Sequence, residues 1–455
     1  MLVIKQWSST YISCRLFSFQ KPKSFISSTR NMSFVNSPND LRTSSAITAN
    51  ATRILVIGAA YGGLSTIMNI LNLCDGKPQF QSPIPVEQVS APQKTPLITL
   101  LDERDGIFHT MGAPLAHTSK AFAPTAWQTF SSVGPLNRAN VRILNGRATG
   151  IDPAAKMATY STGKTEECVE YDYLVVSTGS KRSWPIVPKA LDKASYLKDA
   201  EIHINSLENS SSVVVIGGGA VGIEVTSELK TLFPSKKITL IHSREQLLSS
   251  EPLPDEFKQK ALSLLQDSGV EIVLNARVLS DEETENGFKV VLSTGTELTA
   301  DKVIYATSKQ GPQTNFLPNE VLTEDGYVKV NATMSFSAPI PNARSHFAVG
   351  DIAFWPGIKR VGSAMIMGQF AASNIVAMIA AGEQGKNEKE TVSQDMPRVE
   401  PMMALAVGNR QAVGWQGGMG LFWGEELWRG QFGEDMGLAV VLGHLGLTVS
   451  SEEKN

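Results

Sequence analysis

Two short apolar runs along this chain are each followed by a glycine-rich turn and then by a helix-compatible stretch. Residues 53–57 precede Gly58-Ala-Ala-Tyr-Gly-Gly63, and residues 213–216 precede Gly217-Gly-Gly-Ala-Val-Gly222. A strand, a glycine turn and a helix in this order predict the start of a βαβ unit. Two such starts, about one domain length apart, predict an α/β fold with two Rossmann-like dinucleotide-binding domains.

Further apolar runs predict the strands that complete these units. Residues 97–101 end in Asp102 after a proline- and glutamine-rich insertion, and residues 238–241 end in His242. Three later strand-like runs end in a small-residue turn or in an acid: 171–179, 300–308 and 346–351. Strands that alternate with helices in this way are typical of a doubly wound sheet.

The most apolar long stretch, residues 364–381, is interrupted by Gln369, Ser373 and Asn374. A membrane-spanning helix needs an uninterrupted apolar run of about 18 residues or more, and the chain has none. We therefore expect a buried helix here and no transmembrane segment, while peripheral contact with a membrane stays open.

Size and composition narrow the classes of function. The chain has 455 residues, too many for one hydrophobic core, so two or three domains are expected. Its formal net charge of −3 provides no large basic field, and we expect no nucleic-acid partner. Its cysteines, Cys14, Cys74 and Cys168, form no CxxC or CxxxxC pair, so neither a redox disulfide nor a cysteine-rich metal site is expected.

The first fifty residues differ from the rest of the chain. They carry six basic residues against one acid, Asp40, among many serines and threonines. This composition is typical of a mitochondrial presequence, but a disordered tail or a translation start at Met32 explains it equally well. The sequence thus predicts a mitochondrial or cytoplasmic location and leaves the oligomeric state open.

The second glycine motif has the spacing of a dinucleotide-binding loop. Gly217 permits the tight turn, Gly219 lets the backbone approach a pyrophosphate, and Gly222 lets the helix pack on the sheet. The helix start then offers N–H groups and a partial positive charge to the phosphates. The alternative, a glycine-rich loop without a ligand, is disfavoured by the strand before it and the helix after it.

The first glycine motif is imperfect. Its glycines are Gly58, Gly62 and Gly63. Ala60 takes the middle glycine position, where its methyl group would crowd a pyrophosphate without excluding it. Asp102 supports a nucleotide site here, because an acid at the end of the second strand can accept both ribose hydroxyl protons.

The second unit ends its strand differently, in His242, Ser243 and Arg244, where an NAD site has Asp or Glu. No carboxylate is present to hold a 2′-hydroxyl or to repel a 2′-phosphate. Ser243 and Arg244 are candidates for binding that phosphate, the arginine by charge-assisted hydrogen bonds. The pattern favours NADP(H), or tolerance of it, and the alternative is that Arg244 is a solvated surface charge.

The sequence alone does not decide whether two acids, Asp351 and Glu224, have a functional or a structural role. Asp351 ends the run 346–350, where it can bind ribityl hydroxyls or serve as an ordinary helix cap. Glu224 is expected in the first turn of the second glycine-loop helix, where the helix dipole favours an acid regardless of function.

Taken together, these segments resemble the two-Rossmann flavoprotein reductases over about residues 53–379. The most similar group is apoptosis-inducing-factor-like and includes the ferroptosis-suppressor-type NAD(P)H quinone reductases, members of the pyridine nucleotide-disulfide oxidoreductase superfamily without the redox disulfide. The segments that carry the resemblance are Gly58-Ala-Ala-Tyr-Gly-Gly-Leu64, Leu101-Asp-Glu-Arg-Asp105, Tyr173-Leu-Val-Val-Ser-Thr-Gly179, Gly217-Gly-Gly-Ala-Val-Gly-Ile-Glu224, Ile241-His-Ser-Arg244 and Phe347-Ala-Val-Gly-Asp351.

The resemblance implies FAD on the first loop and NADP(H) or NAD(H) on the second. Further FAD contacts then fall at Thr178, Gly179, Gly350 and Asp351, with the ribityl chain on the last of these. The resemblance also implies two catalytic positions, Glu224 near the flavin–nicotinamide meeting point and Lys359 close to the isoalloxazine ring. Ser308 departs from the family pattern, because a glycine usually ends that strand.

The implied architecture is an FAD domain split between residues 51–185 and 311–394, with an NAD(P)H domain inserted at 186–310. Residues 395–455 form a small C-terminal region, and residues 1–50 are a disordered or targeting segment.

We therefore expect an enzyme, an FAD-dependent NAD(P)H oxidoreductase. NAD(P)H delivers a hydride to the flavin, and without a dithiol the electrons leave on a diffusible acceptor such as a quinone. Two alternatives stay open because the scaffold does not decide between acceptors. One is a biosynthetic flavin oxidoreductase acting on an organic substrate, and the other is a slow-turnover flavoprotein in redox sensing or death signalling.

Overall fold

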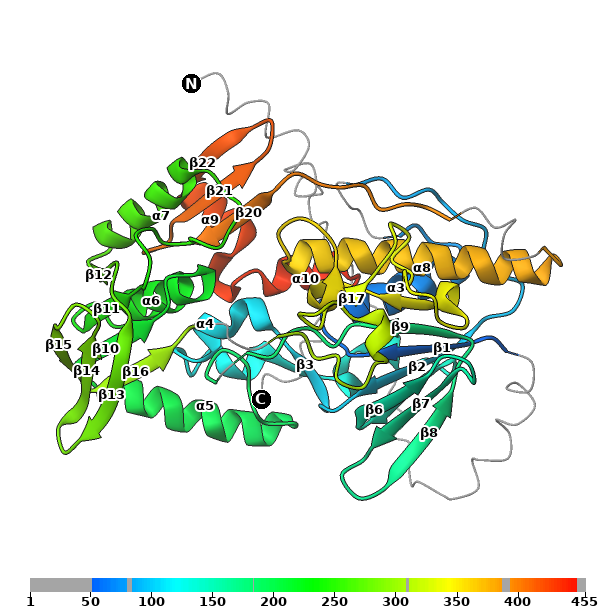
Figure 1. Ribbon diagram of the computed structural model, residues 1–455, viewed down its shortest axis with the longest axis horizontal. Coiled ribbons are helices and arrows are strands. Elements are labelled where there is room, and N and C mark those ends of the chain that lie inside the picture. Colours follow the sequence, from blue (N-terminus) through cyan, green and yellow to red (C-terminus); the bar gives the residue numbers. More distant parts are fainter. Residues whose placement is uncertain (1–50, 80–83, 183, 308–310, 387–392, 448–455) are drawn as a thin grey trace, which may run out of the picture. The chain divides into compact units, whose positions relative to one another are not determined.

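A parallel five-stranded sheet carries the first glycine motif in the computed structural model (Figure 1). Its order is β18-β9-β1-β2-β5, and every neighbouring pair runs parallel. The strands are β1 (Arg53–Ile57), β2 (Leu97–Asp102), β5 (Val141–Asn145), β9 (Tyr173–Val176) and β18 (His346–Ala348). The last four residues of β1 are buried, as expected of a strand covered on both faces, which has no polar side and therefore forms a continuous apolar run.

The structure describes residues 51–79, 84–182, 184–307, 311–386 and 393–447. All of them belong to one compact unit, residues 50–455. The predicted disordered or targeting segment, 1–50, and the departure at Ser308 lie outside the described residues.

Helices cover one face of the first sheet and a small antiparallel sheet covers the other (Figure 1). The helices α3 (Tyr61–Cys74) and α8 (Val361–Glu383) share a hydrophobic core with the strands. On the opposite face, β6 (Arg147–Asp152), β7 (Met157–Ser161) and β8 (Glu166–Glu170) form the antiparallel sheet. Side chains of β7 share a second core with those β1 side chains that point away from the helices.

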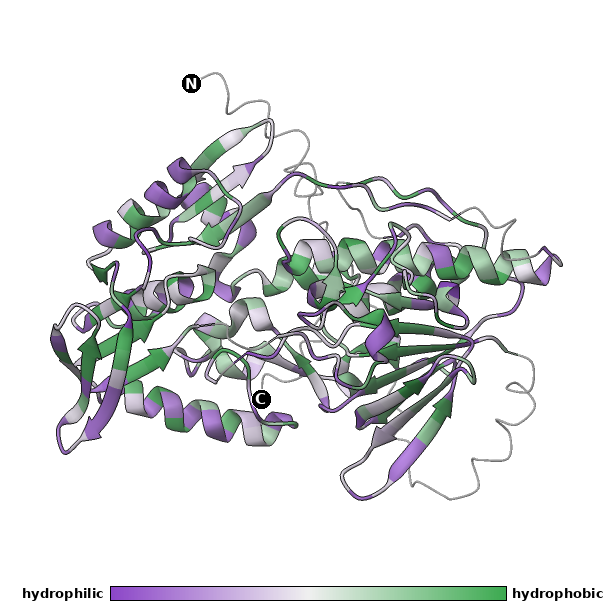
Figure 2. Ribbon diagram, in the orientation of Figure 1, coloured by the Kyte–Doolittle hydropathy of each residue, from purple (hydrophilic) through white to green (hydrophobic). Residues whose placement is uncertain are grey.

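Helix α8 is long and apolar enough to cross a membrane, yet 94% of its most apolar window is buried inside the unit. Figure 2 shows hydrophobic residues along most of its length. The prediction of a buried helix at 364–381 is therefore confirmed. Among the described residues, no second helix has this combination of length and hydropathy.

Helices α3 and α8 cross with backbone close to backbone at Gly368. A Cβ atom at Gly368 would lie 2.5 Å from the carbonyl oxygen of Gly62 and 3.0 Å from the amide nitrogen of Thr66. Ser65 adds a direct link, because its hydroxyl donates to the carbonyl of Met365 at 2.7 Å. The first turn of α3 therefore depends on a glycine far away in the sequence.

A second parallel sheet, of order β12-β11-β10-β16, carries the second glycine motif. Its strands are β10 (Ser212–Ile216), β11 (Lys237–Ile241), β12 (Glu271–Val273) and β16 (Lys302–Tyr305). One face packs on α6 (Ala220–Leu232) and α7 (Asp255–Asp267). The other face packs on an antiparallel sheet of β13 (Val278–Thr284), β14 (Gly287–Leu292) and β15 (Glu297–Ala300). We call the part of the fold built around the first glycine motif the first unit and the part built around the second glycine motif the second unit. The second unit repeats the layers of the first, and the α/β fold class is confirmed.

Both glycine-motif helices begin three residues earlier than predicted, α3 at Tyr61 and α6 at Ala220. Their N-cap residues, Ala60 and Gly219, are extended and lie inside the motifs. The last three residues of each motif form helix although Gly62, Gly63 and Gly222 have low helix propensity, because packing against the strand end outweighs that preference.

The C-terminal residues contribute to both cores. The strands β20 (Met402–Ala406), β21 (Ala412–Gln416) and β22 (Gly420–Gly424) form an antiparallel sheet, and its buried side chains join the core of the second unit. Helix α10 (Leu438–His444) places its buried side chains in the core of the first unit. The C-terminal region therefore links the two glycine-motif units.

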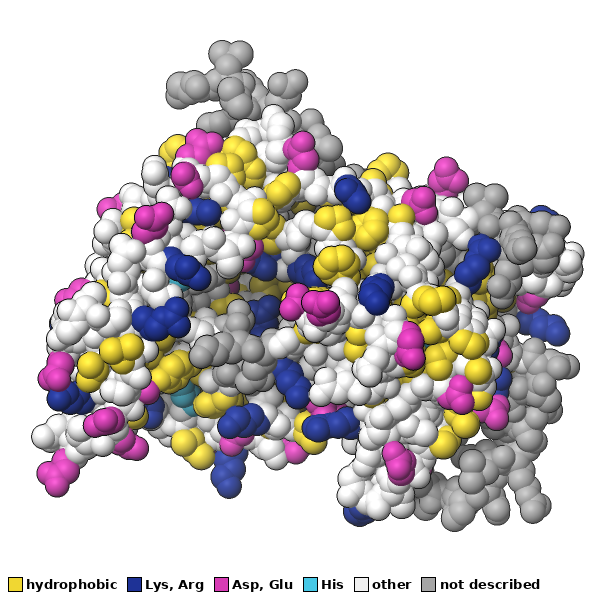
Figure 3. All heavy atoms as spheres, in the orientation of Figure 1, with side chains coloured by type: hydrophobic (Ala, Val, Ile, Leu, Met, Phe, Trp, Pro, Cys, Tyr) yellow, Lys and Arg dark blue, Asp and Glu magenta, His cyan; other side chains and the backbone are white. Residues whose placement is uncertain are grey.

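Shorter elements complete the fold: β3 (Gly106–Phe108), α4 (Ala113–Ala116), β4 (Trp127–Thr129), α5 (Lys193–Glu208), β17 (Val328–Lys329), β19 (Ala353–Phe354) and α9 (Glu425–Gln431). Acidic and basic side chains are interspersed on the face shown in Figure 3, so this face presents no broad field of one sign.

We expect Gly368→Ala to destabilise the protein, because the added methyl group would force α8 away from the first turn of α3. Overpacking of this kind costs roughly 1–3 kcal/mol. The control is Gly382→Ala in the same helix, where a Cβ atom would meet nothing within 4 Å. Alanine should stabilise the helix there by roughly 0.5–1 kcal/mol. Denaturant unfolding followed by circular dichroism measures both variants, and equal midpoints would contradict the close crossing.

Candidate functional site

The first glycine loop turns beside the end of β9. Gly58 has a left-handed φ of +98°, and a Cβ atom there would lie 2.7 Å from the carbonyl oxygen of Ser177. A Cβ atom at Gly63 would lie 2.0 Å from the carbonyl oxygen of Gly58. Both positions require glycine, the first for the turn and the second for the close approach of α3 to the strand end.

The second loop has the same internal contacts. Gly217 has a φ of +119°, and a Cβ atom there would lie 2.8 Å from the carbonyl oxygen of Ala306. A Cβ atom at Gly222 would lie 1.8 Å from the carbonyl oxygen of Gly217. The two loops are therefore matched in structure as well as in sequence.

Ala60 and Gly219 occupy matching positions with matching backbones. Their φ angles are −86° and −81°, which any residue adopts, and a Cβ atom at Gly219 would meet nothing within 4 Å. Ala60 is exposed, so its methyl group lies at the open side of the loop. The departure from glycine at Ala60 thus strains nothing in the fold. Each open position adjoins a helix start, whose first N–H groups have no intrahelical partner and suit an anion.

Asp102 supports the first loop from the end of β2. Its carboxylate accepts hydrogen bonds from the Ala59 amide at 2.7 Å and from the Arg104 amide at 2.9 Å. Burial raises the pKa of Asp102, and the two amide hydrogen bonds oppose that rise. Each carboxylate oxygen can accept more than one hydrogen bond, so capacity remains for ribose hydroxyls.

His242 supports the second loop by accepting a loop amide, as Asp102 supports the first. The Gly218 amide donates to His242 Nδ1 at 3.1 Å, just as the Ala59 amide donates to Asp102. Because Nδ1 accepts, the ring hydrogen lies on Nε2, which is 3.2 Å from the hydroxyl oxygen of Ser249. Burial lowers the pKa of His242, which favours the neutral ring. The sequence named His242 as a cofactor contact and did not show that it supports the loop.

Ser243 and Arg244 follow on the surface. Both side chains are exposed, and within the described residues no ion pair or side-chain hydrogen bond of Arg244 is recorded. The backbone is fixed, since the Arg244 carbonyl accepts from the Asn275 amide at 2.9 Å. Arg244 is therefore anchored through its main chain, with its guanidinium uncommitted to any described partner.

Thr178 and Gly179 lie where β9 ends and meet a segment that the sequence did not single out. The Thr178 hydroxyl donates to the Gln313 carbonyl at 2.6 Å, and the Gln313 side chain donates to the Thr178 carbonyl at 2.9 Å. Gly179 and Gly350 both have left-handed φ angles, +67° and +78°. These turns bring the residues named for FAD to the same end of the sheet as the first loop.

Asp351 and Lys359 lie together at the turn before α8. The Asp351 carboxylate is 3.5 Å from the Arg182 guanidinium. Lys359 donates to the Asp351 carbonyl at 3.4 Å, and its ammonium lies 3.9 Å from the centre of the Tyr327 ring. Burial lowers the pKa of Lys359.

Arg360 was not found from the sequence and joins three parts of the molecule. It is the N-cap of α8, where its amide donates to the Ser363 hydroxyl at 3.0 Å. Its guanidinium donates to the Glu251 carboxylate, which lies in the loop after β11, and reaches the Met403 sulfur in β20. A single residue thus contacts the first unit, the second unit and the C-terminal strands.

Glu224 is not in the first turn of α6, which holds no acid, because the helix begins at Ala220. The explanation of Glu224 by dipole stabilisation is therefore wrong. Burial raises the pKa of Glu224 to about 8, while Arg360, the backbone of Ala406 and Arg182 oppose the rise. At pH 7 the carboxyl group is mainly protonated and can donate a proton.

Tyr61 and His109 form a hydrogen-bonded chain beneath α10. His109 Nε2 lies 3.1 Å from the Met436 carbonyl, which only accepts, so Nε2 carries the hydrogen and Nδ1 accepts from the Tyr61 hydroxyl at 3.0 Å. Burial raises the pKa of Tyr61 to about 12 and lowers that of His109 to about 4, so both are neutral at pH 7.

A small apolar cavity of about 20 Å³, with room for about one water molecule, adjoins this pair. Its lining is mainly aliphatic and comes from α3, from the β3–β4 hairpin and from α10. The residues are Tyr61, Leu64, Ile107, His109, Ala126, Gln128, Leu438, Val441, Leu442 and Leu445. None of them was named from the sequence as a site residue.

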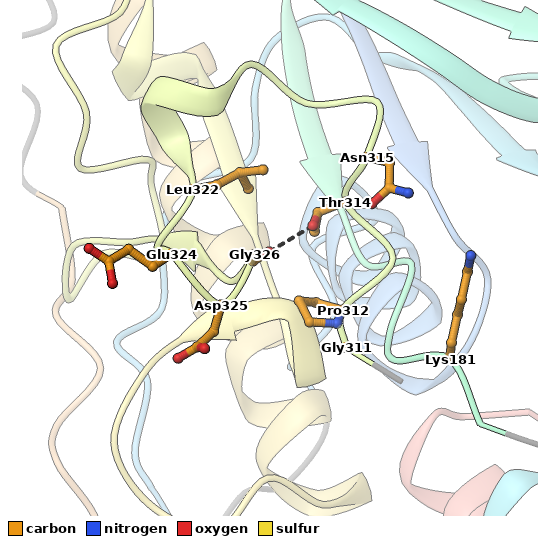
Figure 4. Close-up of a pocket in the computed structure, with 9 residues that line it drawn as sticks. All are labelled: Lys181, Gly311, Pro312, Thr314, Asn315, Leu322, Glu324, Asp325 and Gly326. Atoms are coloured by element: carbon orange, nitrogen blue, oxygen red, sulfur yellow. Dashed lines mark hydrogen bonds between the residues drawn. The ribbon is translucent and has the colours of Figure 1, made fainter. Parts of the chain in front are cut away.

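A second hollow, of about 530 Å³ and open to solvent, lies along the segment that follows the Thr178–Gln313 link (Figure 4). Its lining mixes Lys181 with Glu324 and Asp325, and Thr314 donates to the Gly326 carbonyl at 2.7 Å. No aromatic side chain lines it, so it offers no surface on which a flavin or nicotinamide ring would stack.

The residues present fit two dinucleotides. Each loop combines an open position, a helix start and a strand-end group that accepts a loop amide. The described cysteines, Cys74 and Cys168, are free. In the described part of the chain, no group of three or more His, Cys, Asp or Glu side chains could hold a metal ion.

Comparison with known sequences gives three findings. A family model described as pyridine nucleotide-disulphide oxidoreductase matches residues 52–368. "Oxidoreductase OXR1" of Ajellomyces capsulatus is 40% identical over 424 residues, which is 90% of each chain. "Ferroptosis suppressor protein 1" of Taeniopygia guttata is 28% identical over 61% of this chain and 73% of its own length.

Among solved structures, NDH2 from Plasmodium falciparum in complex with NADH superimposes with a TM-score of 0.64. The match covers 87% of this chain and 97% of that one at 14% identity. At this level of identity the likeness concerns the fold.

Gly219→Ala should leave the folded state unchanged and weaken cofactor binding, because its methyl group would meet only an incoming phosphate. Gly222→Ala is the matched variant, since its methyl group would collide with the Gly217 carbonyl and push α6 off the sheet. We expect a wild-type melting temperature for Gly219→Ala without ligand, together with weaker NAD(P)H binding in a fluorescence titration. A fall in melting temperature as large as that of Gly222→Ala would contradict the open position.

Proposed function

The chain belongs to the pyridine nucleotide-disulphide oxidoreductase family, and we propose that its activity is to pass electrons from NAD(P)H, through FAD, to a diffusible quinone-like acceptor. The family binds FAD and NAD(P)H. One observation carries the proposal: two matched loops, each held by a strand-end acceptor, lie in a chain with no CxxC pair to receive electrons. The resemblance stated from the sequence is confirmed by the family model and by the relatives.

Bound FAD would accept a hydride from NAD(P)H and return the electrons to an acceptor. The amides at the start of α3 would hold its pyrophosphate, and Asp102 would accept the ribose hydroxyls. Asp351, held near Arg182, would bind the ribityl chain. The amides at the start of α6 would hold the pyrophosphate of NAD(P)H in the same way.

The charges at the junction suit a hydride transfer that is coupled to the transfer of a proton. Glu224 keeps its proton at neutral pH because burial raises its pKa to about 8. Arg360 and Lys359, at the start of α8, supply fixed positive charge that would stabilise an electron-rich ring. Glu224 would therefore be the proton donor in that coupled transfer, and Lys359 and Arg360 would position the site and balance its charge.

The cavity beneath α10 supports an apolar electron acceptor. Its aliphatic walls favour an apolar molecule, and the neutral Tyr61–His109 pair gives it one polar edge. A relative at 28% identity is named as a ferroptosis suppressor, and that name specifies no acceptor. The cavity has room for about one water molecule, so its apolar lining, and not its volume, supports an apolar acceptor such as a quinone over a charged metabolite.

We expect Arg244→Ala to raise the half-saturation concentration for NADPH while that for NADH changes little. Loss of one charge-assisted contact to a 2′-phosphate costs roughly 1.5–3 kcal/mol, about tenfold or more in affinity. Steady-state kinetics with both cofactors measures the effect. Equal changes for NADPH and NADH would show that Arg244 does not bind the 2′-phosphate.

His242→Asp is the complementary variant. An aspartate there can accept the Gly218 amide as Asp102 accepts the Ala59 amide, so the loop should stay formed. The new carboxylate would repel a 2′-phosphate, and preference should move toward NADH. An unchanged ratio of kcat/KM for the two cofactors would place the 2′-position away from His242.

Glu224→Gln should leave FAD content and melting temperature near wild type while single-turnover bleaching of the flavin by NADPH slows about tenfold or more. That slowing corresponds to at least about 1.4 kcal/mol of barrier. In the wild type the rate should be constant below pH 8 and fall above it, because only the protonated carboxyl can give a proton. The glutamine variant should show no such break. An unchanged rate with an unchanged break would remove Glu224 from the chemistry.

A further inference from the structure

The segment between β11 and α7, residues 247–253, is hydrogen-bonded to the second glycine loop. The Leu248 amide donates to the Gly218 carbonyl at 2.8 Å. His242 accepts the Gly218 amide through one ring nitrogen, and its other ring nitrogen lies 3.2 Å from the Ser249 hydroxyl. These hydrogen bonds make the segment follow the position of the loop.

The same segment has a fixed backbone that presents Glu251. The Glu251 amide donates to the Leu248 carbonyl at 2.9 Å, and the Leu253 amide donates to the Glu251 carbonyl at 2.8 Å. Leu248 and Leu253 are buried in the core of the second unit. Leu248 has a left-handed φ of +57°, which a bulky side chain keeps only where its surroundings hold it. The Glu251 side chain therefore extends from a rigid turn.

Arg360 binds the Glu251 carboxylate from the start of α8, at 2.5 Å. Its guanidinium also donates to the Lys359 carbonyl at 2.7 Å, and its amide donates to the Ser363 hydroxyl at 3.0 Å. Lys359 in turn donates to the carbonyl of Asp351 at 3.4 Å, and Asp351 is the acid named for the ribityl chain of FAD. A continuous series of hydrogen bonds thus leads from the second glycine loop to the residues of the FAD site.

The Arg360–Glu251 pair differs from an ordinary surface ion pair. The Glu251 side chain is 18% exposed. In the Lys120–Glu208 pair, which has the same length of 2.5 Å, the two side chains are 48% and 42% exposed. Water competes with an exposed pair and leaves its geometry loose, whereas it reaches the Glu251 carboxylate much less. The Arg360–Glu251 pair can therefore fix a distance between the elements that carry it.

We propose that Glu251 is a positioning residue: it holds Arg360 so that the second glycine loop and the start of α8 keep one relative position, which sets the approach of the nicotinamide to the flavin. The inference rests on the proposed function. Hydride transfer needs reacting atoms about 3–3.5 Å apart, and a displacement of about 1 Å can slow a reaction about a hundredfold. Glu251 acts through Arg360 and takes no part in the chemistry.

Glu251→Ala tests this role in single-turnover reduction of the FAD-loaded protein by NADPH. The limiting rate of flavin bleaching should fall about tenfold or more, while the NADPH concentration at half-saturation changes less than about twofold. The rate and the half-saturation separate because the loop still binds the dinucleotide and only its distance from the flavin changes. FAD content and melting temperature should stay near wild type, since a partly exposed ion pair contributes little to stability.

Glu251→Gln is the conservative variant. Its side-chain oxygen can still accept from Arg360, so most of the rate should return. In the Arg360→Ala background, Glu251→Ala should cause no further slowing, because its partner is already missing. The matched control is Glu208→Ala, which removes the exposed ion pair of the same length and should behave as wild type.

Hydrogen exchange measures the same link without any reaction. Exchange in peptides covering residues 245–253, followed by mass spectrometry, should speed up about tenfold in Arg360→Ala, because the segment loses its attachment to α8. Arg360 and Glu251 are 109 residues apart in the sequence, so the effect would pass through their contact. The Glu208→Ala control should exchange at the wild-type rate.

Three results would overturn the proposal: a limiting rate of Glu251→Ala that matches wild type, a Glu251→Gln variant as slow as Glu251→Ala, or unchanged hydrogen exchange in Arg360→Ala. A wild-type flavin that neither NADPH nor NADH reduces would instead refute the proposed function. The exchange experiment would then still decide whether Glu251 and Arg360 join the second glycine loop to α8.

Discussion

Two contacts between a glycine and a backbone carbonyl set the geometry on which the rest of the site depends. Gly63 and Gly222 pack so closely on the first residue of their loops that a methyl group would lie within 2.0 and 1.8 Å of its carbonyl oxygen. These contacts hold each helix start at the end of a buried strand. Helix N–H groups and a strand-end side chain then converge on an open position, where a negatively charged group is stabilised.

Burial determines the charge states at the junction between the two units. The C-terminal strands and α10 cover residues of both units and remove them from water. Because the charged form of a group is disfavoured away from water, burial raises the pKa of Glu224 to about 8 and lowers that of His109 to about 4, so both groups are mainly neutral at pH 7. The segment that links the units therefore also sets their acid–base chemistry.

Local patterns predicted the elements whose chemistry is local. The glycine spacing identified both loops, and the position of Asp102 after an apolar run placed an acid beside the first. Contacts between distant segments could not be read in this way. Arg360 meets Glu251 only because α8 begins beside the second unit, and Met436 meets His109 only because α10 returns to the first. No local spacing marks such pairs, so the sequence located the cofactor loops and missed the groups that surround them.

The central claim is that the two loops hold two cofactors that react with each other. Anaerobic stopped-flow mixing of the FAD-loaded protein with NADPH, either unlabelled or deuterated at the transferred position, tests it most directly. We expect the flavin to bleach completely in one turnover and deuteration to slow the bleaching, because the C–H bond breaks in that step. A flavin that stays oxidised under excess NADPH and excess NADH would contradict the account.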